Sequence, residues 1–175
     1  MSLETILRSA KNKLLARFFT KFPELADRWA ERTPFRESLD IPWTPLRKEI
    51  QDCRVALVTT GGVHLKSQPP FDMENPDRDP SYREIPQDTS PKDLTITHDY
   101  YDHREADQDI NVLFPVERLK ELVRLHAVGE EAPFHYSFMG HIDKDLVGIL
   151  TRQTAPEVAE KLKDAGVGIV LLTPA

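Results

Sequence analysis

The chain has 175 residues, 23 Lys and Arg against 29 Asp and Glu, and a net charge of −6. This length is sufficient for one domain with a substantial core, and the acidic balance provides no bulk field that would attract nucleic acid. With a mean hydropathy of −0.46 and no apolar run near the roughly 18 to 20 residues of a membrane helix, we also expect no membrane partner. A single cysteine, Cys53, excludes an internal disulfide and is typical of a reducing, cytoplasmic location.

The first 50 residues are predicted to form a helical arm and a proline-rich strap. Apolar residues recur at three- and four-residue steps over 2–22, which indicates an amphipathic helix with a solvated basic face. A second short helix is expected over 24–31, followed by an extended strap over 33–46 whose apolar residues hold it against the domain. A basic amphipathic amino terminus can be a transit peptide or a membrane-surface anchor. Packing on the domain or on a partner is favoured, because no cleavage-like region follows.

The stretch at 54–72, RVALVTTGGVHLKSQPPFD, organises the rest of the chain. Residues 55–58 are all apolar and two of them are β-branched, which predicts a strand buried on both faces. Thr60, Gly61 and Gly62 follow at its carboxyl end, where open α/β sheets bind ligands, and His64 adds a titratable group. The alternative is a tight turn with a surface histidine. Neither common glycine-rich nucleotide fingerprint is present.

An irregular segment over 67–93 contains most of the prolines that follow the central strand. A loop this long is usually a lid or a binding loop, and its interleaved aromatic and aliphatic residues argue against disorder. Asp79, Ser81 and Arg83 offer an acid, a hydroxyl and a guanidinium that would suit a carboxylate-bearing ligand. A salt-bridged surface turn is the alternative.

The densest polar cluster follows a short alternating strand over 94–97. His98, Asp99, Asp102 and His103 lie within six residues. Such a cluster can ligate a metal, or a carboxylate can hold one histidine in a single tautomer for proton transfer. A charged surface loop explains it equally well.

The second half of the chain predicts alternating strands and helices. We expect strands at 111–114 and 167–172, a strand or extended segment at 134–141, and helices at 115–127, 143–151 and 156–164, the last capped by Thr154. The predicted fold is a three-layer α/β domain over 51–175 with a mainly parallel, Rossmann-like sheet. The strands at 54–59, 111–114 and 167–172 would bring Thr60, Pro115 and Thr173 to one edge.

Five histidines fall in turn-like positions near predicted strand ends, namely His64, His98, His103, His135 and His141. We expect His64, His98 and His141 to surround one cavity, with Asp99 close by.

Several runs together resemble one family. VALVTTGGVHLKSQPPFD, DPSYREIP, HDYYDH with DINVLFP, HYSFMGH and the closing VLLTP are similar to the selenoprotein B family of glycine, sarcosine, betaine and D-proline reductases. The similarity covers roughly residues 54–175. It implies reductive cleavage of a carbon–nitrogen bond in a small amino or imino acid, in bacterial amino acid metabolism.

The resemblance also implies cofactors and partners. In such enzymes a pyruvoyl group on a partner subunit holds the substrate, a selenolate attacks the α-carbon, and a thiol releases the product. It implies catalytic roles for His98, Asp99, His103 and His141, and substrate binding near Thr60, Gly61, Gly62, His64 and Arg83, with no metal. Assembly of the chain into a homo-oligomer is compatible with the resemblance.

Two departures from the family pattern stand out. Arg78 occupies a position where a glycine is expected, and the family's selenocysteine or cysteine would follow the Thr173–Pro174 pair, where this sequence has only Ala175. Since UGA encodes selenocysteine, we expect a UGA codon after Ala175, an in-frame continuation and a nearby cysteine. A metal-dependent hydrolase built on the histidines, and a non-catalytic scaffold of the same fold, are the alternative functions.

Overall fold

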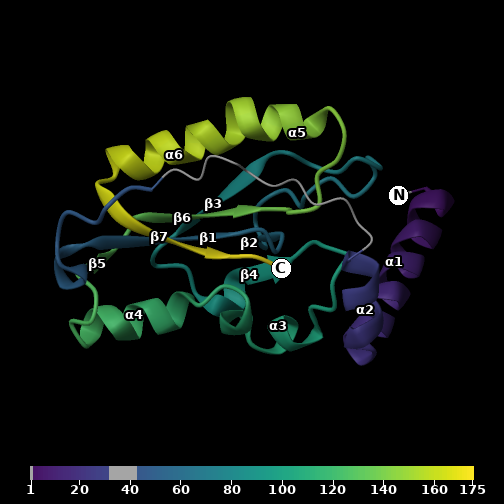
Figure 1. Cartoon of the computed structure of the whole chain (residues 1–175), viewed down its shortest axis with the longest axis horizontal. Helices are drawn as coiled ribbons and strands as arrows, with labels where there is room; N and C mark the ends of the chain where they lie inside the picture. The colour runs from purple at the N-terminus through teal and green to yellow at the C-terminus, as the bar shows by residue number, and fades with distance from the viewer. Residues whose placement is uncertain (1, 32–42) are drawn as a thin grey trace.

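A computed structural model describes residues 2–31 and 43–175 (Figure 1). Its centre is β1 (Arg54–Thr59), whose apolar side chains are almost entirely buried. β1 pairs in parallel with β7 (Val167–Thr173) on one side, and with β5 (Glu130–Glu131) and β6 (Phe134–Phe138) on the other. β3 (Tyr82–Pro86) adds to β6 in the antiparallel direction. The chain is therefore a mixed α/β protein with a mainly parallel sheet.

Helices cover both faces of this sheet (Figure 1). On one face lie α5 (Leu146–Ile149), a π-helical turn (Leu150–Thr154) and α6 (Ala155–Asp164). α4 (Val116–Arg124) lies on the other face, with α3 (Arg104–Gln108) beyond it. Two apolar clusters result, one centred on Leu57 and Phe114 and the other on Ala56 and Tyr136. Burial of these clusters against both faces of β1 is the main force that holds the domain together.

A second, two-stranded sheet stands beside the first. β2 (Val63–Leu65) pairs antiparallel with β4 (Leu94–Ile96), so the turn after β1 leads directly into it. Short 3₁₀ turns at Ile50–Asp52, Pro91–Asp93 and Ile110–Val112 connect the larger elements. Among the described residues, no helix combines the length and apolar character needed to cross a bilayer.

β7 forms one margin of the main sheet. Within the described part of the chain it pairs only with β1. Its seven residues carry no charge, and Leu171 and Leu172 are 48% and 68% exposed. Its outward backbone groups therefore have no strand partner among the described residues.

The arm consists of α1 (Leu3–Lys21) and α2 (Pro23–Ala30), as the periodicity predicts. The face that α1 turns to the domain was predicted wrongly. Thr5 and Ala16 are its buried residues, and Asn12 donates to Asp99 across 3.2 Å. Its leucines and phenylalanines point outward and are 43–73% exposed: Leu3, Ile6, Leu7, Leu14, Leu15 and Phe18. The small polar face packs inward because it satisfies buried groups of the domain.

The predicted strand at 111–114 is wrong. Residues Ile110–Val112 form a 3₁₀ turn, because the Asp109 carboxylate accepts from the backbone N–H and the side-chain amide of Asn111. This local bonding competes with strand pairing. Phe114 is nevertheless fully buried, so the apolar run packs without pairing.

One smaller prediction fails, and another is described only in part. Thr154 has helical dihedral angles and donates its hydroxyl to the Pro80 carbonyl, so it is not an N-cap. The strap lies mostly outside the described residues. At its described end Trp43 is 87% exposed and Leu46 is 47% exposed, so these two do not hold it against the domain.

Candidate functional site

The carboxyl ends of β1, β6 and β7 meet at one edge of the sheet, as parallel pairing requires. The Thr59 hydroxyl donates to the Thr173 carbonyl across 2.8 Å and accepts from the Gly61 N–H. The backbone N–H of Ala175 lies 3.3 Å from the Thr60 hydroxyl. Thr60 and Thr173 therefore lie together as predicted, whereas Pro115 follows a 3₁₀ turn and not a strand.

Glycines at this edge permit two close crossings of the backbone. Gly62 has φ +68°, and a Cβ built there would lie 2.4 Å from the Thr97 carbonyl oxygen. Gly140 has φ +88°, and its Cβ would lie 2.4 Å from the Thr60 carbonyl oxygen. Both positions require glycine for the packing of protein on protein. The Gly61 carbonyl accepts from the Tyr101 hydroxyl at 2.9 Å, which fixes the turn to the segment after β4.

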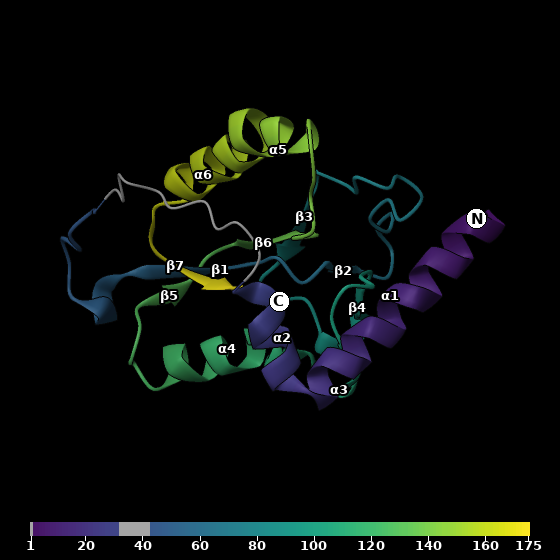
Figure 2. The ribbon, with the colours of Figure 1, turned by 45° about the vertical axis from the view of Figure 1, so that its right-hand side comes forward.

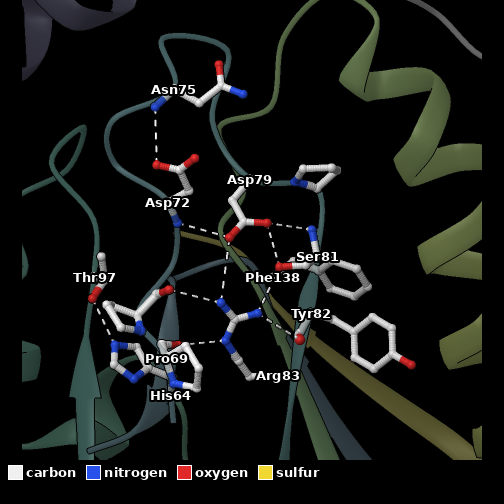
Figure 3. Close-up of polar contacts among 12 residues, drawn as sticks. His64, Pro69, Asp72, Asn75, Asp79, Ser81, Tyr82, Arg83, Thr97 and Phe138 are labelled. Carbon is white, nitrogen blue, oxygen red and sulfur yellow. Dashed lines mark hydrogen bonds and ion pairs between the residues drawn. The ribbon is translucent and has the colours of Figure 1, made fainter.

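His64 is buried, and both of its ring nitrogens are engaged. Nδ1 lies 2.8 Å from the Leu65 carbonyl. Nε2 lies 2.8 Å from the Thr97 hydroxyl (Figure 3). Since a carbonyl only accepts, Nδ1 carries the proton and Nε2 accepts from Thr97. Burial is the main cause that lowers the pKa of His64, so the ring is neutral near pH 7. It lies beside Phe71, at the irregular loop.

Arg83 is the centre of that loop (Figure 3). Its Nε donates to the Pro69 carbonyl, one terminal nitrogen to Ser81 and to the Tyr82 carbonyl, and the other to the Pro70 carbonyl. The second terminal nitrogen also lies 3.6 Å from Asp79. All three guanidinium nitrogens thus have protein partners, and the loop is ordered by this residue.

His98 is the most perturbed histidine. Burial, together with the nearby charges of His141 and His103, lowers the pKa of His98 to about 4. Its Nδ1 accepts from the Tyr100 N–H at 3.0 Å, and a backbone hydrogen bond links the ring to Met139 at the end of β6. A neutral His98 therefore joins the 98–103 segment to the end of β6.

Behind His98 lies a buried ion pair. Arg78 and Asp99 are separated by 3.2 Å, and their side chains are 0% and 1% exposed. The Arg78 guanidinium also lies 4.8 Å from the centre of the Tyr100 ring. The opposite partner of that ring is His141, stacked at 3.8 Å with an interplanar angle of 16°. His141 is in turn 3.2 Å from Asp143.

The remaining predicted residues, His103 and Asp102, are partly buried in the same segment and pair with more exposed partners. His103 Nδ1 is 2.8 Å from Asp107, and Asp102 is bound by Arg104. Hydrogen bonds from Arg104 lower the pKa of Asp102 to about 2. His98, Asp99, His103 and His141 therefore gather around Tyr100 and Tyr101, while His64 and Arg83 belong to the irregular loop.

Sequence reasoning missed several residues of this arrangement. Arg78 has φ +74°, which explains why a glycine is expected there, yet its side chain reaches inward to Asp99. Asn12 gave no signal, because a single amide on a helix is ordinary. His135 was counted among the turn histidines but lies fully buried on β6, where its Nδ1 accepts from the Leu57 N–H and its Nε2 is 2.7 Å from Glu131.

The arrangement does not favour metal chemistry. Among the described residues, no group of three or more His, Cys, Asp or Glu side chains is placed to hold a metal ion. His64 and His98 already use their ring nitrogens within the protein. His103 and His141 are each paired with a carboxylate through one ring nitrogen.

The chain is thus a mixed α/β protein with a cluster of histidines, carboxylates and tyrosines in the segments that follow β4 and β6. Comparison with known proteins makes this specific. The family "Glycine/sarcosine/betaine reductase selenoprotein B" matches residues 26–175, and the chain belongs to it.

Two curated relatives extend the comparison. The chain is 38% identical over 131 residues to the D-proline reductase subunit gamma of Acetoanaerobium sticklandii, which covers 75% of this chain and 52% of that one. It is 31% identical over 142 residues to the sarcosine reductase complex component B subunit beta of Peptoclostridium acidaminophilum, covering 76% of this chain and 30% of that one. The chain thus spans about half the length of the first relative and less of the second. No solved structure matches.

Proposed function

We propose that the chain acts within a selenoprotein B-type subunit that reductively cleaves the carbon–nitrogen bond of a small amino or imino acid. The observation that carries this proposal is the family match over 26–175, combined with the polar residues gathered at the carboxyl edge of its sheet. Glycine, sarcosine and D-proline are the substrates to test first, because the names of the family and its relatives contain them.

The chemistry divides between the implied groups and this chain. A selenocysteine would supply a nucleophile ionised at neutral pH, and a pyruvoyl group on a partner subunit would hold the amine. A selenocysteine following Ala175 would be attached to the residue whose N–H lies beside the Thr60 hydroxyl. The residues bonded together at this edge, Thr59, Thr60, Gly61, Thr173 and Ala175, have uncharged side chains.

This chain's own contribution is proton control. The nitrogen that leaves the substrate needs a proton, and His141 and His103 are the histidines of the site with a carboxylate partner and exposed ring atoms. Neutral His98 and the Arg78–Asp99 pair hold Tyr100, on which His141 stacks. We assign positioning roles to His98 and Asp99.

The test is turnover by the protein expressed from its whole locus, with UGA readthrough, and purified with its co-expressed partner subunit. We expect ammonia from glycine, methylamine from sarcosine or the ring-opened amino acid from D-proline when a dithiol is supplied. His141→Gln should lower turnover at least about tenfold, with unfolding unchanged. Glu160→Gln, on the far helix α6, is the matched control.

Two results would overturn the proposal. The first is absence of turnover with all three substrates in a complex that contains selenium and a pyruvoyl group. The second is a UAA or UAG codon after Ala175, which would give the scaffold alternative the lead.

A further inference from the structure

A small cavity of about 180 Å³ lies between α1 and the segment that leads into α3. Residues of α1 and of the start of α3 line it together, and Figure 2 shows the end of α1 passing in front of α3. The volume corresponds to about six water molecules at about 30 Å³ each, which is too small for a nucleotide and suitable for a small metabolite. The lining comes from two elements: Lys13 and Arg17 on α1, and Tyr101, Asp102, His103, Arg104 and Asp107 on the other side.

The charges on the two sides of this cavity are not balanced. Arg104 is paired with Asp102 at 2.5 Å, and His103 with Asp107 at 2.8 Å. Within the described ranges, no hydrogen bond or ion pair engages the charged groups of Lys13 and Arg17. Residues four apart lie on the same side of a helix. Two cations without a direct ion pair therefore border the cavity on one side, and the charge of Arg17 also helps to lower the pKa of Asp102 across it.

The opposite wall offers the complementary chemistry. His103 uses Nδ1 for Asp107, and its Nε2 has no hydrogen bond to any described residue. Asp107 is half exposed, so its second carboxylate oxygen is accessible. Tyr101 donates its hydroxyl to the Gly61 carbonyl, which joins this wall to the turn at the sheet edge. A ligand here would touch cations on one side and a histidine–carboxylate pair on the other.

We propose that this cavity binds a small amino or imino acid as its zwitterion. The carboxylate of the ligand would lie between Lys13 and Arg17. The planar guanidinium of Arg17 can donate to both carboxylate oxygens at once. The amine nitrogen would face His103 and Asp107. The choice of an amino or imino acid as the ligand rests on the proposed function. Binding itself requires neither selenium nor a partner subunit.

The inference concerns residues that the family match does not include. The match begins at residue 26, whereas Lys13 and Arg17 belong to α1. α1 is held in place by Asn12 on Asp99 and by Arg8 on the Met73 and Glu74 carbonyls. The arm therefore completes a ligand site whose other wall belongs to the matched domain.

The experiment is an NMR titration of the whole chain with glycine, D-proline and L-proline as probes. Acetate and methylammonium serve as probes for a carboxylate or an amine alone. We expect saturable shifts of the backbone signals of residues 101–107 with at least one amino acid, with a Kd of about 1 mM or tighter. Acetate and methylammonium should bind at least about tenfold more weakly.

Three charge-matched variants decide whether the cavity is the site. Lys13→Gln and Arg17→Gln should each weaken binding about fivefold or more. Lys11→Gln removes the same charge from the same helix but does not line the cavity, and should bind as the unmodified chain does. Because all three side chains are exposed, their unfolding midpoints should stay unchanged.

Three outcomes would overturn the proposal. Equal weakening by Lys11→Gln would show a bulk charge effect, and acetate binding as well as amino acids would show a simple anion site. Absence of saturable shifts with all three amino acids would remove the site altogether. Binding without turnover in the complete complex would instead overturn the proposed reductase function and leave the cavity assignment intact.

Discussion

Asp99→Asn should be among the most destabilising isosteric changes in the domain. Asp99 is the counterion of Arg78, and both side chains are essentially inaccessible to solvent. Removing one partner of a buried pair leaves an uncompensated charge, which costs about 3–5 kcal/mol. Against a typical total of about 5–15 kcal/mol, the variant should remain folded with a much lower urea midpoint.

A double-mutant cycle tests whether the loss comes from the pair. Arg78→Met should cost a similar amount, because it leaves the buried Asp99 carboxylate without its counterion and with Asn12 as a side-chain donor. Methionine, like arginine, must adopt the left-handed backbone conformation at position 78, so the backbone strain is the same in the variant and in the unmodified chain. The double variant carries no buried charge and should lose at least about 2 kcal/mol less than the sum of the singles.

Urea unfolding followed by far-UV circular dichroism measures all three variants. Glu121→Gln is the control, because its pair with Arg118 is exposed on α4 and should contribute no more than about 1 kcal/mol. Additive single losses, or a loss below about 1 kcal/mol for Asp99→Asn, would refute the reasoning.

Three further predictions test other contacts. Gly140→Ala should cost at least about 2 kcal/mol in thermal unfolding, because its Cβ would lie 2.4 Å from a carbonyl oxygen, whereas Gly166→Ala, with its nearest atom at 3.5 Å, should cost about 1 kcal/mol; equal losses would contradict the packing argument. His98 has a pKa lowered from 6.5 to about 4, so its contribution of about 3 kcal/mol is complete above pH 6.5 and is lost as the pH falls toward 4. In the His98→Gln variant the urea midpoint should depend less on pH between about pH 7 and about pH 4.5. An unchanged dependence of the midpoint on pH would contradict this. His135→Phe leaves the buried Leu57 N–H without its acceptor and should cost about 1–3 kcal/mol by urea unfolding. An unchanged free energy of unfolding would show that another acceptor replaces the ring.

The parts of the fold that the sequence predicts are those with long, consistent patterns. The strand at 54–59 and the strand at 167–172 are apolar on both faces, and the helix over 156–164 shows clear periodicity. The run at 111–114 is equally apolar but short, and the Asp109–Asn111 bonding decides its conformation locally. β3 escaped prediction because Pro86 ends it and prolines surround it, yet a proline is tolerated at the end of an edge strand.

The candidate site was predictable in its residue types and only partly in its arrangement. The cluster from His98 to His103 signals a polar segment, but the sequence does not reveal which ring nitrogens are already bonded. His64 and His98 differ from His103 and His141 only in burial and in the backbone groups nearby, and tertiary packing determines both. Arg78 and Asn12 lie 21 and 87 residues from Asp99 in the sequence, so no local pattern could pair them with it.

The uncharged margin at β7 has a consequence for handling the chain. Natural sheets usually protect such a strand with a lysine, a proline or a bulge. The seven residues of β7 include no lysine or proline, and its register shift against β1 lies at its first residues, opposite Arg54 and Val55. β7 can therefore act as a template on which a strand from another molecule hydrogen-bonds, with Leu171 and Leu172 adding apolar contact. Such pairing increases with protein concentration. The oligomeric state measured in a concentrated sample can therefore reflect association through β7 as well as a physiological assembly. A lysine introduced by Leu172→Lys would separate the two, because it blocks strand addition and leaves contacts elsewhere on the surface unchanged.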